Sequence, residues 1–252
     1  MKITLAQIHT VAGDVEGNVV KIIEAAHKAK ASSLVIFPEL AVSGTGSYEM
    51  FKTPGFIDKC EKALDKIAAE CETVSVLVGC PVGNFNAAVY MFQGQRKVFK
   101  KKYLEDFEKM CFEPSDADEL LQIGCHKYAV TIGKDLENTN DDEFLLTNRV
   151  DELMPLAPDV IINIGAERCG VNQSRIRRNT LRQNVLKTER PLVFVNNVAS
   201  KEEATYDGGS MIFGYESYVV ASAPFFEEDV LDVNLECLIS MKHEDEQQDY
   251  VL

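Results

Sequence analysis

The stretch that decides the fold is Leu34-Val35-Ile36-Phe37-Pro38-Glu39-Leu40. Its four consecutive apolar residues, ended by a proline, are typical of a short buried strand. The carboxylate of Glu39 follows that strand directly, and ligands of α/β folds collect at the carboxyl ends of strands. Apolar surroundings raise the pKa of a carboxyl group there toward the range of a general base. The stretch predicts a buried strand that ends at a candidate catalytic carboxylate, and an acid that caps a turn is the alternative.

Strand and helix patterns alternate outward from this stretch. Lys2–Gln7 alternates polar and apolar side chains, as a half-buried strand does. Apolar residues at three-and-four spacing predict helices from Val15 to about Lys30 and from Phe56 to about Cys71. Further strands are predicted at residues 74–82, 87–92, 97–100, 128–132, 160–164, 192–197 and 211–213, and further helices at 141–153 and 173–187. The alternation predicts an α/β fold of sheets covered by helices.

The sequence contains no repeat and no low-complexity linker. We therefore expect one domain over residues 1–240, followed by a polar, acidic tail over residues 241–252. A chain of 252 residues buries enough surface to form a core without disulfides or metals.

Charge and composition exclude several classes of function. The chain carries 40 Asp and Glu against 26 Lys and Arg, a formal net charge of −14 at pH 7. This acidic balance argues against binding to nucleic acid or to anionic membranes, because both depend on clusters of Lys and Arg. The N-terminus turns polar too quickly for a signal peptide, and no apolar run approaches the roughly 20 residues of a membrane span. Seven cysteines without a C-x-x-C pair indicate reduced thiols, so a cytoplasmic protein is expected.

General motifs for nucleotide, serine-hydrolase and metal chemistry are missing from the sequence. It has no G-x-x-x-x-G-K-[ST] phosphate loop, no complete dinucleotide fingerprint and no G-x-S-x-G elbow. Its four histidines are scattered. We therefore expect no metal and no cofactor.

Several short motifs, spread from residue 2 to about residue 235, occur in the order of one known family. They are Lys2–Ile8, Gly13-Asp14-Val15-Glu16-Gly17-Asn18, Phe37-Pro38-Glu39-Leu40-Ala41, Phe112-Glu113-Pro114, Asn163, Val193-Phe194-Val195-Asn196, Asp207-Gly208-Gly209-Ser210 and Ala223-Pro224-Phe225-Phe226-Glu227-Glu228-Asp229. Together they resemble the nitrilase (carbon–nitrogen hydrolase) superfamily, and more narrowly the glutamine-hydrolysing domain of glutamine-dependent NAD synthetases. The resemblance implies a four-layer αββα sandwich that often pairs through a two-fold interface, so a homodimer is expected.

The same resemblance implies a Glu–Lys–Cys triad that acts on amides or nitriles. In this triad the Glu is the general base, the Lys stabilises the oxyanion, and the Cys attacks the substrate carbon to form an acyl-enzyme. Glu39 matches the first member, and Lys101 matches the Lys of a K-x-x-L signature. Strand alternation points Lys101 away from Lys100 and Lys102, which fit a solvated basic patch.

The nucleophile is missing from its expected place. The family pattern V-x-I-C-E-D aligns with Val130-Thr131-Ile132-Gly133-Lys134-Asp135, so Gly133 stands at the Cys position and Lys134 at the Glu position. Glycine has no side chain and forms no covalent adduct there. We expect Lys134 to form an ion pair with Glu39 and to neutralise the former base.

Other pocket positions also depart from the family pattern. The segment that is small in the family reads Gly165-Ala166-Glu167-Arg168-Cys169, so Glu167 and Arg168 are expected to alter or fill the amide pocket. The loop after Leu104 is shorter than in the family, which leaves open whether Glu108 is a second pocket glutamate. The sequence lacks the S-G-G-x-D-S ATP loop of the synthetases, so we do not expect the chain to make NAD by itself.

Three functions fit these observations, and the sequence favours the first. A catalytically silent protein would keep Glu39 and Lys101 as binding residues for a small amide or carboxylate, or act as a regulatory subunit. An active amidase would need a relocated nucleophile, either Cys169 after a strand end or, less well, Cys125; an ordinary half-buried thiol is the alternative for both. In the third function, a water activated by Glu39 hydrolyses a more reactive substrate without a covalent intermediate.

Overall fold

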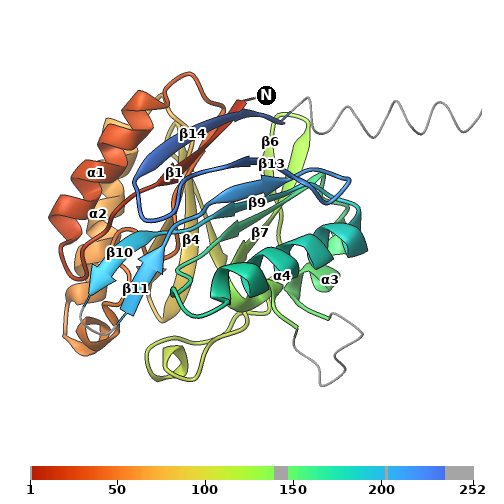
Figure 1. Cartoon of the computed structure of the whole chain (residues 1–252). Coiled ribbons are helices and arrows are strands. Elements are labelled where there is room, and N and C mark those ends of the chain that lie inside the picture. Colours follow the sequence, from red (N-terminus) through yellow and green to blue (C-terminus); the bar gives the residue numbers. More distant parts are fainter. Residues whose placement is uncertain (1, 139–146, 202–203, 236–252) are drawn as a thin grey trace, which may run out of the picture.

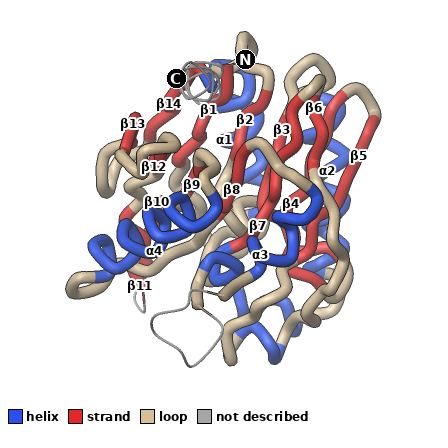
Figure 2. The backbone as a smooth tube through the Cα atoms, turned by 90° about the vertical axis from the view of Figure 1, so that its right-hand side faces the viewer, coloured by secondary structure: helices blue, strands red, loops and turns tan. Residues whose placement is uncertain are grey.

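Two six-stranded β-sheets lie at the centre of the molecule, with helices on their outer sides (Figures 1 and 2). The computed structural model describes residues 2–138, 147–201 and 204–235. Within these residues each sheet has three parallel strands in its middle and antiparallel strands at its edges. Parallel strands require crossover connections, which explains the alternation of strand and helix in the sequence.

The first sheet brings distant parts of the chain together. Its strands, in spatial order, are β14 (Asp229–Asn234), β1 (Lys2–Gln7), β2 (Leu34–Ile36), β3 (Val76–Val82), β4 (Phe85–Phe92) and β5 (Gln95–Lys100). Strands β1, β2 and β3 are parallel, and β14 pairs antiparallel with β1 along its whole length. Strand β5 lies at the far edge, paired antiparallel with β4.

The second sheet follows the same plan. Its strands, in spatial order, are β13 (Val219–Ser222), β12 (Met211–Phe213), β9 (Leu192–Val195), β8 (Val160–Ile164), β7 (His126–Ile132) and β6 (Leu121–Ile123). Strands β7, β8 and β9 are parallel. A separate hairpin pairs β10 (Val198–Lys201) with β11 (Ala204–Asp207).

Four α-helices of the described residues cover these sheets. They are α1 (Val15–Lys28), α2 (Phe56–Glu70), α3 (Arg149–Leu153) and α4 (Gln173–Thr188). Short 3₁₀ helices span Tyr48–Lys52, Glu108–Met110, Gly133–Leu136 and Met154–Leu156. Helix α1 begins where the sequence predicts, because the Asp14 side chain accepts a hydrogen bond of 3.0 Å from the Gly17 N–H. In Figure 1, α1 and α2 lie beside the first sheet, and α3 and α4 beside the second.

Three apolar clusters hold the four layers together. One lies between α1, α2 and the first sheet, and another between α3, α4 and the second sheet. The third fills the space between the sheets, where Leu5 and Ile36 share a cluster with Val130 and Ile162. Helix, sheet, sheet and helix therefore follow one another, which confirms the expected αββα sandwich.

Strand β2 shows why the deciding stretch is apolar throughout. Leu34 and Ile36 belong to the cluster between the sheets, and Val35 belongs to the cluster under the helices. All three residues are fully buried. Because successive side chains of a strand point to opposite faces, a strand with two buried faces needs apolar residues at every position.

Some expected elements differ from the structure. The helix expected over residues 141–153 is described only from Arg149, where the Asn148 side chain caps it by accepting from the Val150 N–H at 3.0 Å; residues 139–146 lie outside the described part. Strands β6, β10, β11 and β13 were not expected, and β14 begins at Asp229, where the last family motif of the sequence ends. The expected tail over residues 241–252 lies outside the described residues. Of the helices that the structure describes, none has both the length and the apolar character that crossing a membrane demands.

Candidate functional site

Glu39 lies just beyond β2 on a loop that is packed from two sides. Its backbone N–H donates to the Gly165 carbonyl oxygen at 3.3 Å, which ties the loop to the end of β8. A Cβ on Gly79 of β3 would lie 2.3 Å from the Pro38 carbonyl oxygen, so the two backbones are in close contact. Leu40 is fully buried with φ of +53°, a conformation that costs energy for an L-residue. The loop directs Glu39 inward, and only 3% of this residue is exposed.

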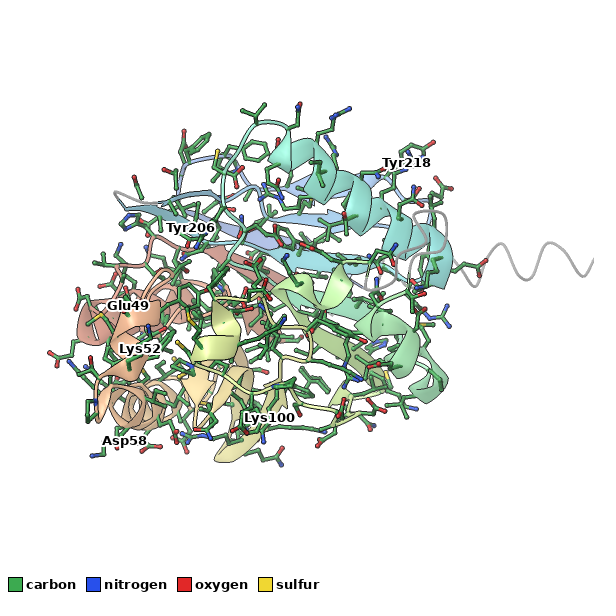
Figure 3. The ribbon with its side chains drawn as sticks, turned by 90° about the horizontal axis from the view of Figure 1, so that it is seen from below. Glu49, Lys52, Asp58, Lys100, Tyr206 and Tyr218 are labelled. Carbon is green, nitrogen blue, oxygen red and sulfur yellow. The ribbon has the colours of Figure 1, made fainter. Side chains whose placement is uncertain are left out.

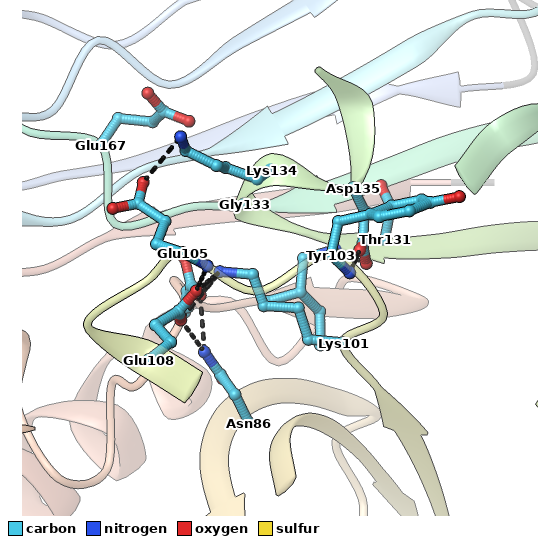
Figure 4. Close-up of polar contacts among 12 residues, drawn as sticks. Asn86, Lys101, Tyr103, Glu105, Glu108, Thr131, Gly133, Lys134, Asp135 and Glu167 are labelled. Atoms are coloured by element: carbon cyan, nitrogen blue, oxygen red, sulfur yellow. Dashed lines mark hydrogen bonds and ion pairs between the residues drawn. The ribbon is translucent and has the colours of Figure 1, made fainter. Parts of the chain in front are cut away.

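Lys101 follows β5 and reaches Glu39. Its Nζ lies 2.8 Å from Glu39 Oε1, and 2.9 and 2.8 Å from the two carboxylate oxygens of Glu108 (Figure 4). Lys101 is 3% exposed and Glu108 is 1% exposed. The structure thus brings together three of the predicted site residues from different parts of the chain.

The neighbours of Lys101 have other contacts. Lys100 lies with its Nζ 3.7 Å from the centroid of the Phe85 ring, and Figure 3 labels it at the rim of the molecule. Lys102 pairs with Glu152 at 2.6 Å. Only Lys101 of this lysine triplet points into the buried cluster.

Asn86, which the sequence analysis missed, connects the two carboxylates. Its Nδ2 on β4 donates to Glu39 Oε1 at 2.7 Å and to Glu108 Oε1 at 2.9 Å. The Glu105 backbone N–H donates to Glu108 Oε2 at 2.9 Å. A polar amide inside the apolar strand Phe85–Phe92 is the signal that could have identified Asn86, because buried polar groups need partners.

Two carboxylates and one ammonium group share this buried cluster, and the pKa values of Glu39 and Lys101 are shifted there. Burial raises the pKa of Glu39 to about 7; the Lys101 ammonium lowers it and the Glu108 carboxylate raises it. Burial by itself would lower the pKa of Lys101, but the two carboxylates outweigh burial and raise it. Lys101 therefore stays charged, and Glu39 exchanges its proton near neutral pH.

Gly133 lies opposite this cluster, at the end of β7. Its φ is +48°, in the left-handed region that favours glycine. A Cβ at this position would lie 2.8 Å from Glu39 Oε2 and 2.9 Å from Lys101 Nζ. A side chain at position 133 would therefore point between the acid and the cation.

Hydrogen bonds fix the backbone around Gly133. Asn163 on β8 donates from Nδ2 to the Gly133 carbonyl oxygen at 3.2 Å. The buried Asp135 carboxylate accepts from the N–H groups of Ile132 at 3.0 Å and Tyr103 at 2.9 Å. Asp135 thus ties the turn after β7 to the segment that carries Lys101.

The expected ion pair between Lys134 and Glu39 is wrong. Lys134 Nζ lies 3.5 Å from Glu105 Oε1 and 3.5 Å from Glu137 Oε2, and its side chain is 40% exposed (Figure 4). The 3₁₀ helix that begins at Gly133 turns Lys134 away from the buried cluster, where Glu39 already has Lys101 as its cation. Long contacts on a part-exposed side chain contribute little stability.

A cavity of about 860 Å³ opens onto the cluster. Glu167, Arg168 and Cys169 follow β8 and line it, so the two charged residues alter the pocket without filling it. The Arg168 guanidinium lies 5.1 Å from the centroid of the Phe107 ring. Tyr206, labelled in Figure 3, also belongs to the wall.

The two alternative nucleophiles lie in different places. Cys169 is exposed and lines the cavity. Cys125 is exposed in the turn between β6 and β7, at the opposite end of β7 from Gly133. The structure therefore brings Cys169 to the cavity and leaves Cys125 outside it.

A second buried ion pair supports the wall of the cavity and was missed by the sequence analysis. Arg177 of α4 donates from both Nη atoms to the Asp207 carboxylate at 3.0 and 3.1 Å. Asn196 Nδ2 donates to the Gly208 carbonyl oxygen at 2.9 Å beside this pair. Arg177 and Asp207 lie 30 residues apart, so no local pattern could have joined them.

Several known proteins resemble this chain over most of its length. No family model matches the chain. Glutamine-dependent NAD(+) synthetases of Aquifex aeolicus and Thermotoga maritima are each 28% identical over 248 residues, which cover 94% of this chain and 42% of each relative. The chain thus spans less than half the length of these curated relatives.

Solved structures have the same fold. The glutamine-dependent NAD+ synthetase from Acinetobacter baumannii matches with a TM-score of 0.82 and 25% identity, over 94% of this chain and 46% of that one. An amidase from Nesterenkonia sp. AN1, which has an active-site cysteine, matches with a TM-score of 0.79 and 17% identity, over 100% of both chains.

The chain therefore shares its fold with an amidase of the nitrilase superfamily and resembles glutamine-dependent NAD(+) synthetases in both sequence and fold. Its sequence is homologous to the glutaminase domain of glutamine-dependent NAD synthetases.

Proposed function

We propose that this chain is a catalytically silent member of the nitrilase superfamily, a binding or regulatory protein whose cavity takes up a small amide or carboxylate. The observation that carries the proposal is the position of Gly133. A side chain there would point between Glu39 Oε2 and Lys101 Nζ, where a nucleophile could reach both. Glycine offers no atom for a covalent intermediate, although the base and the cation are still in place.

The remaining groups suit binding. Glu39 Oε2 faces the space at Gly133 and accepts hydrogen bonds from an amide NH₂, while Lys101 brings positive charge for a carbonyl or carboxylate oxygen. Nucleophile and base act as a unit in covalent catalysis, so loss of the nucleophile removes most of the rate enhancement.

Ammonia release tests the proposal. Wild-type protein at high concentration is incubated with a panel of amides that includes glutamine, beside Glu39→Gln, Cys169→Ser and Gly133→Cys. We expect wild type to release no more ammonia than Glu39→Gln. Release by wild type that disappears in Cys169→Ser would overturn the proposal and identify a relocated nucleophile.

The Gly133→Cys variant needs its own control. A Cβ at this position comes within 3 Å of both polar groups, and the positive φ is strained for a side chain. Gly133→Ala, compared with wild type by thermal unfolding, shows whether the site accepts a Cβ. Ammonia release by Gly133→Cys but not by Gly133→Ala would mean that the old site is intact apart from its nucleophile.

A water activated by Glu39 is the second candidate function. The observation in its favour is the burial of Glu39, which raises the pKa of this carboxyl to about 7, because a general base is most effective when its pKa lies near the working pH. Ammonia release by wild type that survives in Cys169→Ser and disappears in Glu39→Gln would establish this function instead.

A further inference from the structure

The wall of the cavity carries more acid than base. Among the residues that the structure describes, its charged side chains are five glutamates, two lysines and two arginines. Arg177 is already neutralised by Asp207, through two hydrogen bonds of 3.0 and 3.1 Å. A cavity with excess negative charge attracts cations and repels anions.

Most of these charges have partners. Lys101 is held by Glu39 and Glu108, and Lys134 by Glu105 and Glu137. The remaining cation, Arg168, is 5.1 Å from the Phe107 ring centroid.

Glu167 is the acidic residue of this wall whose carboxylate has no partner among the described residues. Its backbone N–H donates to Asn196 Oδ1 at 2.9 Å, but within the described residues no hydrogen bond or ion pair engages its carboxylate. Burial raises the pKa of Glu167 and the nearby Glu137 carboxylate raises it further, whereas the more weakly acting Arg177 and Lys101 lower it. An unpaired carboxylate in a partly dehydrated wall gains from a cation that binds there.

A second unpaired acceptor lies deeper in the same cavity. Both hydrogen bonds that Glu39 accepts, from Asn86 and Lys101, go to Oε1. Oε2 accepts none within the described residues and faces the space beside Gly133. Since Glu39 is 3% exposed, this oxygen depends on a ligand or water for its hydrogen bond.

We infer that the cavity binds a small amide that carries a cationic amine, with the amine on Glu167 and the amide NH₂ on Glu39 Oε2. This inference rests on the proposed binding function and names its ligand class. Bulk and charge at position 167, where the sequence analysis expected a small residue, thereby become a specificity determinant instead of an obstruction.

Binding measurements with wild-type protein test the ligand class. The probes are ω-amino amides of three to six carbons, the neutral amide of matched length, and the matching anion in which a carboxylate replaces the amine. Isothermal titration calorimetry should give an affinity for one amino amide about tenfold or more above that for its neutral counterpart, and weakest binding of the anion. Equal affinity for the amino and neutral amides would overturn the inference.

Two variants test whether Glu167 binds the cationic amine of the ligand. Glu167→Gln removes the unpaired charge, and Glu137→Gln removes a charge from the same cavity that is already paired with Lys134. Glu167→Gln should lower the affinity for the amino amide about tenfold or more and leave the neutral amide unchanged, whereas Glu137→Gln should have an effect within about threefold. Equal losses in both variants would attribute the preference to the general field of the cavity and overturn the role of Glu167.

The ammonia assay keeps the two proposals separate. Turnover of any amide by wild type would reject the silent function, whereas the ratio of amino to neutral affinity alone judges the ligand class. Equal affinity for the amino and neutral amides without turnover would uphold the silent function and reject the ligand class.

Discussion

Lys101 is the residue on which the buried cluster depends, because it is the cation that both Glu39 and Glu108 contact. Its removal leaves two carboxylates close together with little access to water. Breaking a buried ion pair by removing one partner is strongly destabilising, although such pairs add little net stability when intact.

We predict that Lys101→Met lowers the free energy of unfolding by about 3–5 kcal/mol at pH 7. The loss should shrink as the pH falls, because protonation of Glu39 removes its unpaired charge. Urea unfolding at pH 7 and pH 5 measures both effects.

Lys102→Met is the matched control. Lys102 is also a paired lysine, but its side chain is 21% exposed and its partners lie near the surface. We expect a loss within about 1 kcal/mol that changes little with pH. Similar losses in the two variants would contradict the dependence on Lys101.

Strand β3 supports the site through its backbone. A Cβ on Gly79 would meet the Pro38 carbonyl oxygen at 2.3 Å and the Leu40 N at 2.4 Å, and backbone atoms cannot move aside cheaply. The element that lies beside β2 therefore sets the position of Glu39 as well as pairing with its strand.

We predict that Gly79→Ala lowers the free energy of unfolding by about 1–3 kcal/mol, the usual cost of overpacking. Gly170→Ala is the control, since the nearest atom to its added Cβ is 3.7 Å away. Urea unfolding of both variants measures the difference, and equal stability of the two would show that the Glu39 loop is not held by β3.

At the scale of elements, the sequence predicts what is strongly periodic or apolar. The apolar run of β2, with Glu39 after it, is evident from the residues alone, whereas the αββα layers and the choice of Lys101 came from the family resemblance. Strands β10 and β11 escaped prediction because each has only four residues, too few for a clear alternation of polar and apolar side chains.

Long-range polar contacts could not be predicted from the sequence. The partners of Lys134 depend on the direction in which the 3₁₀ helix beginning at Gly133 turns, and the local sequence pattern does not reveal that direction. Asn86 could be read as an unusual residue in a strand, but its two carboxylate partners come from the loop after β2 and from Glu108.

For the molecule as a whole, the buried cluster makes stability depend on pH. Burial raises the pKa of Glu39 from 4.5 to about 7. Between these values the folded chain holds a proton that the unfolded chain has released, so the free energy of unfolding falls as the pH rises.

We predict that the contribution of Glu39 to the free energy of unfolding falls by up to about 3 kcal/mol between pH 4.5 and pH 7, and that Glu39→Gln removes this pH dependence. The measurement is the difference in unfolding free energy between wild type and Glu39→Gln across this range, which cancels the titration of other groups. A difference that does not vary with pH would contradict the assignment.

The homodimer expected from the family resemblance is a separate prediction, which light scattering of the wild type tests.

The pairing of β1 with β14 has a consequence for how the protein is made. Lys2 lies opposite Asn234, so once β1 has left the ribosome, one of its edges waits uncovered until β14 has been made. At cellular rates of synthesis this wait lasts roughly ten to fifty seconds. An uncovered strand edge is a template for pairing with another chain. Until β14 is made, this edge of β1 is open to pairing with a neighbouring nascent copy, and slower translation lengthens that exposure.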